Sequence, residues 1–451
     1  MAGKMAAAAT EPTAGHDQGV RTGWSVFALA VAMSFCFLDR QIMALLITPI
    51  KRDLNLSDTQ MSVLIGFTFV IFYVAVGIPL SRLVDRRSRK WIISIGLAFW
   101  SLMTAACGLA QNFWQLALAR IGVGVGESCN TPATYSLIAD MFPREKLGRA
   151  IAIVNLGNVA GQGLAFFAGG ALIIWLSHGA AAGLPVIGHL RPWQLTFLLL
   201  GIPGLLWAAA LVATVPEPSR RQEATGLEGS PNLADIVRFV AHQRRVYAPL
   251  ILGITIKAML SFGMAVWAPA FLERAFGWPT GRPGLYIGAI SLIMMPAGLL
   301  LGGWLTDRRM TEGHEDAPVF VMALATTALL PFAVLFPLMP TAELALAMLA
   351  SSLFFGAAGT SPGNAAIQLV TPGGMRGTVT AFYIAVMNVL GNGVGPLVVA
   401  LFTDHVFRSE AMLPQSMAMT AILLAPVGVY LSWSVRGAYL AAVQTTRERT
   451  A

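Results

Sequence analysis

Four charged residues stand inside long apolar stretches in the first third of the chain. Asp39 and Arg40 are adjacent, and Arg120 and Glu127 lie seven residues apart in the run RIGVGVGES. A charge at the centre of a bilayer costs from about 3 to more than 10 kcal/mol, so such a group usually faces a cavity or a partner and serves a function. These residues are therefore candidate parts of a transport or proton-binding site.

The four side chains divide into two chemical roles. Arginine stays protonated, so Arg40 and Arg120 act only as fixed positive charges toward a carboxylate or a phosphate. Asp39 and Glu127 are the groups whose protonation could change during a cycle. The alternative is that the four charges only neutralise one another and fix helix packing.

Helix geometry suggests how the four residues are connected. Arg120 and Glu127 share a helix face but stand about 10 Å apart along the axis, too far for a direct pair. Asp39 falls between them in depth, so we expect a relay of Asp39, Arg120 and Glu127. Arg40 is about 100° round the first helix from Asp39.

The composition places these residues in a membrane protein. The chain has 451 residues, of which 56% are hydrophobic and 12% charged, whereas about a quarter of the residues of a soluble protein are charged. The three cysteines lie in apolar runs and are interpreted as small buried residues. We expect neither a metal site nor a bound cofactor.

Twelve stretches are long enough to cross about 30 Å of hydrocarbon. They are predicted at residues 24–47, 60–83, 91–110, 113–140, 149–176, 193–215, 247–272, 284–306, 318–338, 343–370, 378–403 and 413–435. Residues 216–246 between the sixth and seventh spans are rich in charge, Pro and Gly and read as a linker with an amphipathic helix at 233–244. The predicted domains are therefore 1–215 and 247–451.

The basic residues predict the orientation of the chain. Most of the thirty Lys and Arg lie in loops on the side of the two termini, whereas six lie in the opposite loops. By the positive-inside rule both termini are cytoplasmic. The spread of this charge over loop ends argues against nucleic-acid binding. We expect a multi-pass protein of a bacterial inner membrane.

Lys257 is the third basic residue inside a span, after Arg40 and Arg120. It could contact an anionic head group, cap a neighbouring carbonyl, or extend toward the membrane surface. Gly122, Gly124 and Gly126 resemble a phosphate-binding loop, but they lie within a predicted membrane helix, so close helix packing explains them better.

Uncharged polar residues within the spans are further candidates for the lining of a cavity. They are Asn130, Thr134, Asn155, Asn158, Gln162, Asn388 and Asn392. The alternative for each one is a hydrogen bond between helices.

The two halves of the chain contain related motifs. The second span ends in SRLVDRRSRK and the eighth ends in GWLTDRR, each with Asp-Arg four residues after a small residue. Two six-helix halves in the same orientation follow, which is typical of one large class of transporters.

These motifs resemble known families. The pattern of Ser81, Asp85, Arg86, Ser88, Arg89 and Lys90 resembles the signature of the major facilitator superfamily, with Ser in place of Gly at both small positions. FLDRQ at 37–41, GVGES at 124–128 and LIADMFPREKLGRA at 137–150 resemble the spinster family. The resemblance implies an all-α membrane protein with twelve transmembrane helices in two six-helix bundles, in which spans 1 and 4 line a central cavity. It also associates the chain with lysophospholipid and sphingosine-phosphate transport.

The resemblance further implies a cytoplasmic gate that breaks as the two halves rock. Its members here would be Asp85, Arg86, Arg89, Asp307 and Arg308. The alternative is that these charges only record topology.

The sequence thus predicts a secondary transporter rather than an enzyme, because no catalytic pair lies within the spans. The expected substrate is an amphipathic lipid, such as a lysophospholipid or a sphingosine phosphate, moved by a monomer with protons as coupling ion. Asp39 and Glu127 would bind the proton, while Arg40, Arg120 and Lys257 would bind substrate or relay charge. The alternatives are a major facilitator exporter of drugs or small organic anions, and a receptor or channel.

Overall fold

The first half of the chain forms one bundle of long helices. The computed structural model describes residues 13–84, 86–179, 190–218, 233–372 and 375–448. The helices of this half are α1 (Thr13–Leu45), α2 (Ile47–Leu54), α3 (Asp58–Ser62), η1 (Val63–Phe67), α4 (Thr68–Val84), α5 (Arg89–Cys107), α6 (Phe113–Glu127), α7 (Asn130–Met141), α8 (Arg144–Ser177) and α9 (Pro192–Thr214).

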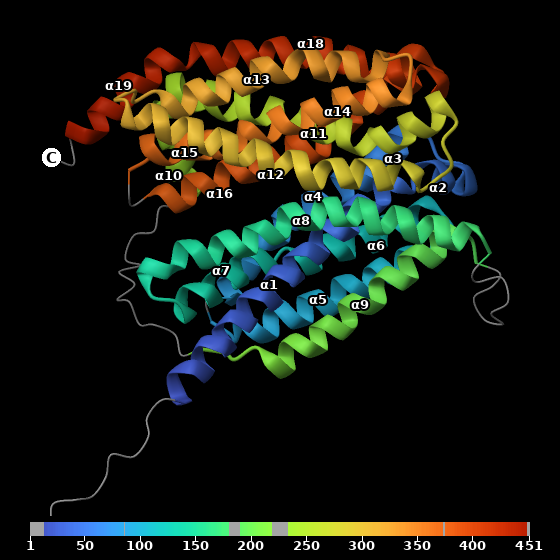
Figure 1. Ribbon diagram of the computed structural model, residues 1–451, viewed down its shortest axis with the longest axis horizontal. Coiled ribbons are helices and arrows are strands. Elements are labelled where there is room, and N and C mark those ends of the chain that lie inside the picture. Colours follow the sequence, from blue (N-terminus) through green and yellow to red (C-terminus); the bar gives the residue numbers. More distant parts are fainter. Residues whose placement is uncertain (1–12, 85, 180–189, 219–232, 373–374, 449–451) are drawn as a thin grey trace, which may run out of the picture.

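The second half forms another bundle, which lies above the first in Figure 1. The short helix α10 (Leu233–His242) precedes it and falls at the predicted amphipathic segment; residues 219–232 of the predicted linker lie outside the described residues. The elements of this second bundle are α11 (Arg244–Phe276), α12 (Arg282–Thr311), α13 (Ala317–Leu335), η2 (Phe336–Leu338), α14 (Ala342–Ala358), α15 (Thr360–Val370), α16 (Arg376–Met387), η4 (Asn388–Val394), α17 (Gly395–Leu401), η5 (Phe402–Phe407), η6 (Glu410–Met412), α18 (Leu413–Ser434) and α19 (Arg436–Glu448).

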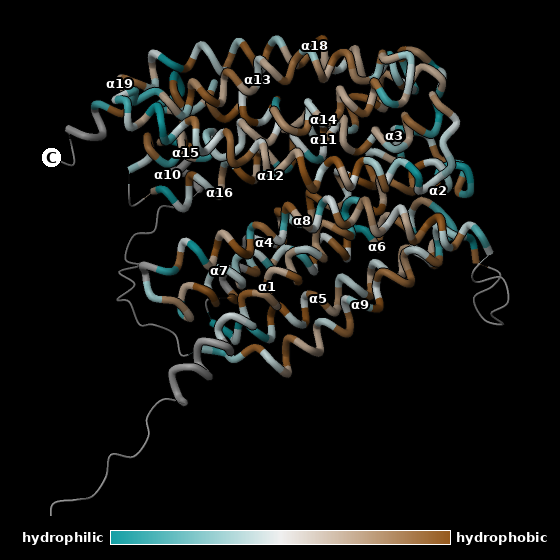
Figure 2. The backbone as a smooth tube through the Cα atoms, in the orientation of Figure 1, coloured by the Kyte–Doolittle hydropathy of each residue, from teal (hydrophilic) through white to brown (hydrophobic). Residues whose placement is uncertain are grey.

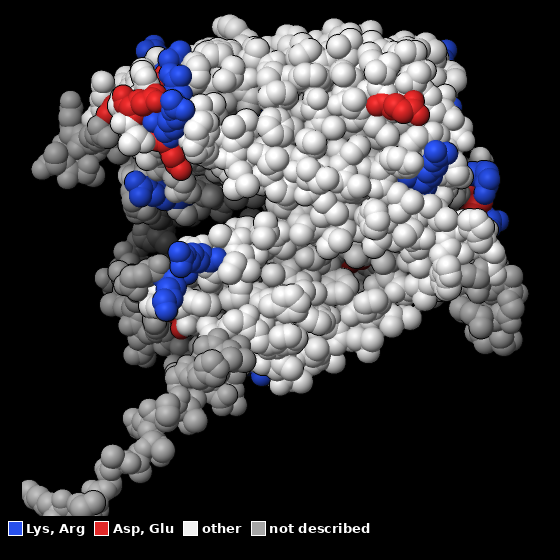
Figure 3. Space-filling model, in the orientation of Figure 1, with Lys and Arg blue, Asp and Glu red and all other residues white. Residues whose placement is uncertain are grey.

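The predicted all-helical membrane architecture is confirmed. Eleven helical stretches among the described residues are long and apolar enough to cross a membrane. Apolar residues fill the middle of the helices and hydrophilic ones lie toward their ends (Figure 2). Charged side chains on the visible face gather at the two ends of the molecule (Figure 3), as expected for a band of hydrocarbon between two aqueous surfaces.

The fourth predicted span differs from the expectation of one continuous helix. It consists of α6 and α7, which are separated by a turn at Ser128 and Cys129 directly after Glu127. Three glycines precede this turn and favour helix poorly, and Ser128 Oγ donates to the carbonyl of Val125 at 2.7 Å. The charged run RIGVGVGES therefore ends at a break in the helix.

Other spans are interrupted too. The tenth span breaks at Gly359, between α14 and α15. The second and eleventh spans contain the π-helical segments η1 and η4, and π-segments of this kind frequently mark functional sites.

Glycines bring several helices into backbone contact, as predicted for RIGVGVGES. A Cβ on Gly124 would lie 2.6 Å from the carbonyl oxygen of Phe69 on α4. A Cβ on Gly66 of η1 would lie 2.7 Å from the carbonyl oxygen of Asn392 on η4. The two π-segments therefore touch each other where the bundles meet.

The two bundles contact each other mainly at one end of the molecule, hereafter the distal end. It lies opposite the start of α1 and the end of α19. There α8 packs on α12 so closely that a Cβ on Gly288 would lie 2.4 Å from the backbone nitrogen of Phe167. Toward the end that holds the start of α1 and the end of α19, hereafter the terminal end, Figure 3 shows a hollow between the two bundles. The interior is therefore closed on one side and open on the other.

Candidate functional site

Arg40 and Glu127 form an ion pair between α1 and the end of α6, in which the Glu127 side chain is fully buried and the Arg40 side chain is 23% exposed. Arg40 Nη2 lies 2.6 Å from Glu127 Oε2, and Arg40 Nε donates to the same oxygen at 3.0 Å. Aromatic rings also surround the guanidinium, with the Phe69 centroid at 4.5 Å and the Tyr73 centroid at 5.2 Å. Glu127 Oε1 is buried and has no hydrogen-bond partner among the described residues. The pair thus occupies one carboxylate oxygen and leaves the other free.

Arg120 contacts Asp39, as the expected relay requires, but it does so through the backbone of α1. Its Nη1 donates to the backbone carbonyl of Asp39 at 3.3 Å, and its Nε donates to the carbonyl of Leu64 at 3.5 Å. Its Nη2 is buried without a hydrogen-bond partner in the described part of the chain. Arg120 therefore meets Asp39 through the backbone, and the cation that binds Glu127 is Arg40. The difference depends on the rotation of α1, since residues 39 and 40 point about 100° apart.

A cavity of about 170 Å³ lies beside this ion pair and is lined by both bundles. Arg40, Gln41 and Phe69 line it from the first half, and Asn388 and Asn392 line it from the second. Asp39, Arg120 and Glu127 are not among its lining residues. Arg40 is therefore the member of the charged group that a molecule in this cavity would touch.

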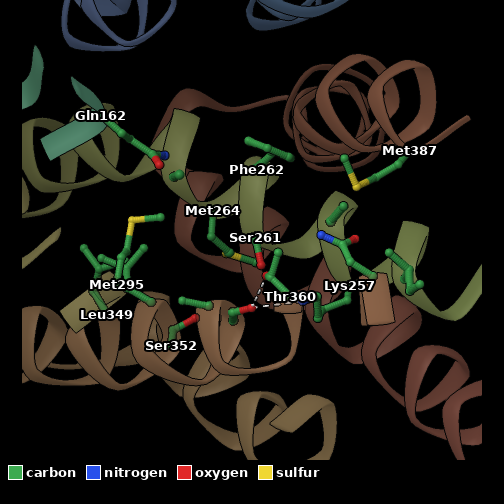
Figure 4. Close-up of a pocket in the computed structure, with 17 residues that line it drawn as sticks. Gln162, Lys257, Ser261, Phe262, Met264, Met295, Leu349, Ser352, Thr360 and Met387 are labelled. Carbon is green, nitrogen blue, oxygen red and sulfur yellow. Dashed lines mark hydrogen bonds between the residues drawn. The ribbon is translucent and has the colours of Figure 1, made fainter. Parts of the chain in front are cut away.

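A second cavity of about 210 Å³ surrounds Lys257 of α11. The buried ammonium donates to the carbonyl of Gly356 at 3.0 Å and to Thr360 Oγ1 at 3.1 Å. These two residues lie on either side of the break at Gly359, so Lys257 caps a carbonyl there, which was one of its three predicted roles. In Figure 4 Thr360 and Ser261 lie near the middle of the group of lining residues, and Gln162 reaches in from the first bundle.

The polar lining of the second cavity was only partly foreseen. Gln162 was a candidate cavity residue, as were Asn388 and Asn392 beside the first cavity. Ser261, Ser352, Thr360 and Asn364 were missed. One signal was available: Ser261 follows Lys257 by four residues and Asn364 follows Thr360 by four, which places each pair on one helix face.

An ion cluster that the sequence did not predict joins the two bundles at the distal end. Asp58 is fully buried and accepts from Lys51 Nζ at 2.5 Å and from Arg274 Nη1 at 2.7 Å. Lys51 also lies 2.9 Å from Glu410 Oε1 of the second half. Nearby, the backbone amide of Thr59 donates to Asp404 Oδ2 at 2.6 Å. The basic residues Lys51 and Arg274, interpreted from sequence as loop charges, thus hold the distal contact between the bundles.

The described members of the predicted gate lie at the terminal end, and the ion-pair partners of Arg89 and Arg308 lie within single bundles. Arg89 is buried, and its guanidinium binds Asp140, Glu217 and the carbonyl of Pro218, all in the first half of the chain. Arg308 pairs with Glu312 on its own helix at 3.1 Å. Arg86 and Asp307 are exposed, and Asp85 lies outside the described residues. A contact across the bundles through these residues stays a prediction.

Glu217 lies outside the membrane-spanning helices and is held by several donors. Partial burial favours its neutral form, but Ser88 Oγ at 2.7 Å, the Lys90 amide at 2.8 Å and the Arg89 guanidinium at 2.9 Å all bind the carboxylate. These hydrogen bonds lower the pKa of Glu217 below its ordinary value. The start of α5 is thereby tied to the segment that follows α9.

Comparison with known proteins identifies the family. The Major Facilitator Superfamily model matches residues 29–396. An "MFS-type efflux pump" of Mycolicibacterium smegmatis is 27% identical over 93% of this chain and 94% of its own length. Mouse "Protein spinster homolog 1" is 28% identical over 83% of this chain and 71% of its own length.

Solved structures show the same fold. A crystal structure of a bacterial homologue of the human lysosomal transporter spinster, in an inward-facing and unoccupied conformation, covers 95% of this chain and 98% of its own, with a TM-score of 0.79 and 24% identity. The crystal structure of a D-xylose–proton symporter covers 90% of this chain with a TM-score of 0.64 and 16% identity. With its partly buried charge pair and two cavities in two helical bundles, the chain belongs to the major facilitator superfamily of secondary transporters and is similar to spinster proteins.

Proposed function

We propose that this chain is a proton-coupled transporter that moves an amphipathic lipid-like substrate by alternating access. The observation that carries the proposal is the Arg40–Glu127 pair, in which Glu127 is fully buried, Arg40 lines a cavity between the bundles, and Glu127 Oε1 has no partner among the described residues. A proton bound to Glu127 removes the negative charge that holds Arg40. Arg40 then becomes available to a molecule in the cavity.

Asp39 and Arg120 contribute to this switch from positions outside the lining of the two cavities. Arg120 is buried against the backbone of α1 at Asp39 and lines neither cavity. Its fixed charge therefore acts on the carboxylates rather than on the substrate. Asp39 is buried beside the pair and is the second proton-binding group of the proposal. A change in protonation at either carboxylate alters the balance of charge between α1 and α6.

The two ends of the molecule supply the alternating access. With both termini in the cytoplasm, as the basic loops indicate, the hollow in Figure 3 faces the cytoplasm and the Asp58 cluster closes the opposite side. This is an inward-facing arrangement, and similarity to an inward-facing spinster homologue supports it. Both bundles belong to one chain, so a monomer in a bacterial inner membrane suffices for the cycle.

A lipid-like substrate is favoured by the character of the cavities and by the relatives. The lining of both cavities is largely apolar, with Phe262 and Met387 shared between them. The similarity to spinster homologues extends over 83% of the chain. The amphiphile proposed is a lysophospholipid or a sphingosine-phosphate-like lipid, whose apolar tail would lie on such walls.

The experiment that tests the proposal is transport into proteoliposomes after a pH jump. Wild type should move a labelled lysophospholipid faster with an imposed pH gradient than without one. Asp39→Asn and Glu127→Gln should lose that stimulation but keep exchange of substrate at equal pH, because exchange needs no net proton movement. Glu312→Gln is the matched control, since Glu312 is exposed and its ion pair with Arg308 lies along one helix. If the pH gradient stimulates transport by Glu127→Gln as much as transport by wild type, the proposed switch is wrong.

A second candidate is export of drugs or small organic anions. The similarity to the mycobacterial efflux pump, which covers nearly the whole of both chains, favours it. Uptake of a hydrophilic organic acid or a cationic dye by the same proteoliposomes, without uptake of lysophospholipid, would select this alternative.

A further inference from the structure

Lys257 carries a buried positive charge for which the described part of the chain provides no counter-ion. The residue is 5% exposed, and its two hydrogen-bond partners, the Gly356 carbonyl and the Thr360 hydroxyl, are both neutral. The described residues that line its cavity include no Asp and no Glu. An unpaired buried charge is costly, so this site gains most from a ligand that brings a negative charge.

The ammonium also has a donor left for such a ligand. A lysine ammonium carries three N–H donors, and two of them are used at the break of the tenth span. Ser261, Ser352 and Asn364 line the same cavity and add neutral polar groups. The donors that an oxyanion would need are therefore already gathered around one positive charge.

Glu127 does not offer an unpaired negative charge to a positively charged group on a ligand, because Arg40 already pairs with it. Glu127 belongs to the neighbouring charged group and is bound to Arg40 at 2.6 Å, and Glu127 lines neither cavity. The two cavities share Phe262 and Met387, so a molecule extending from one into the other meets Lys257 and Arg40 but no unpaired acid among the described lining residues. A choline or ethanolamine group would find no anionic partner in that lining.

We infer that the Lys257 cavity binds the anionic head group of a singly negative amphiphile and selects it over a zwitterionic amphiphile with the same tail. The inference rests on the proposed function and narrows its substrate class. The apolar remainder of the ligand lies on Leu349, Leu353 and Met295, which line the same cavity. The head group replaces the missing counter-ion of Lys257.

The test is direct binding to purified wild-type protein in detergent, without a pH gradient. The ligands are lysophosphatidylglycerol, which is anionic, and lysophosphatidylcholine, which is zwitterionic, with the same acyl chain. Wild type should bind the anionic lipid about 10- to 100-fold more tightly, the range of one charge-assisted hydrogen bond. Lys257→Met should remove that preference, and Lys257→Arg should retain most of it. Lys146→Met, which removes an exposed lysine, is the matched control.

Inorganic phosphate forms a further arm, because a free anion offers the same oxygen chemistry without a tail. Phosphate that fails to displace bound lysophosphatidylglycerol at millimolar concentration supports an amphiphile site. If phosphate displaces the lipid at concentrations near the lipid's own dissociation constant, the cavity is a simple anion site and the inference is overturned.

Failure of this inference is distinguishable from failure of the proposed function. Equal binding of the two lysolipids by wild type, or equal loss of both in Lys257→Met, overturns the charge selection and leaves lipid transport standing. Binding of neither lysolipid to wild type overturns the lipid substrate, and the inference falls with it. The wild-type comparison requires no variant, so it decides even if Lys257→Met does not fold.

Discussion

The two halves of the molecule place a cation at corresponding positions, but the two cations have different partners. In the first half, Arg40 of the first span reaches the fourth span where α6 ends, at Glu127. In the second half, Lys257 of the seventh span reaches the tenth span where α14 ends, near Gly359. In each half a cation on the leading helix meets a broken helix beside a cavity.

The difference lies in what the cation finds there. Arg40 binds a carboxylate, so its charge is paired. Lys257 finds only a carbonyl and a hydroxyl among the described residues, so its charge is open to a ligand. The repeated framework therefore holds two cation sites with different partners, which we propose to act as a switch in the first half and as a recognition site in the second.

Giving Lys257 a carboxylate should make the second half resemble the first, and we expect this change to have the largest effect on ligand binding. In Thr360→Asp the new carboxylate lies where Thr360 Oγ1 now binds Lys257 at 3.1 Å. Affinity for lysophosphatidylglycerol should fall about 10- to 100-fold, because the ammonium is then paired. Equilibrium binding measures this. Thr360→Asn, neutral and of the same shape as the aspartate, should keep most of the affinity; an equal loss in both variants would show that shape, not charge, is responsible.

The terminal ends of the halves offer the next comparison. Arg89 is buried among Asp140 and Glu217, whereas Arg308 is exposed and pairs along its own helix. Arg89→Met should lower the free energy of unfolding by about 3 kcal/mol, as expected when a buried ion pair is broken. Arg308→Met should change it by about 0–1 kcal/mol. Thermal unfolding in detergent measures both, and similar losses would contradict the asymmetry.

Two aspartates near the distal end allow a contact between the halves to be compared with contacts within one half. Asp58 binds Arg274 across the bundles and Lys51 within its own bundle, while Asp53 binds Arg191 at 2.8 Å and Trp193 Nε1 at 2.7 Å within the first bundle. Asp58→Asn should shift the population toward distal opening by about tenfold, a typical coupling between states. Asp53→Asn should not. Distances between spin labels at the distal ends of α3 and α17 report the shift; equal populations in the two variants would refute it.

The smallest predicted effect is on acid stability and arises at Glu217. Its folded pKa is lowered, so its contribution to stability is complete above the unfolded pKa of about 4.3 and is lost as the pH falls through the folded pKa. Unfolding temperatures of wild type should therefore decline more steeply below about pH 4 than those of Glu217→Gln. Glu312→Gln should follow the wild-type curve. Parallel curves for Glu217→Gln and wild type would show that the hydrogen bonds to Glu217 contribute nothing.

The sequence by itself determined the class of protein, the approximate spans and which charges lie within them. Hydrophobic length and the cost of a buried charge are local quantities, so they can be read without knowing what packs against what. For the same reason RIGVGVGES was recognised as exceptional, and its glycines as packing positions.

Only the tertiary structure decided which charges meet. Residues 39 and 40 differ by about 100° around α1, so the rotation of that helix, set by its packing, chose Arg40 rather than Arg120 as the partner of Glu127. The distal cluster of Asp58 and the cavity around Lys257 likewise join segments more than ninety residues apart. Spacing along one chain cannot fix contacts of this kind, because they depend on how separate helices turn toward each other.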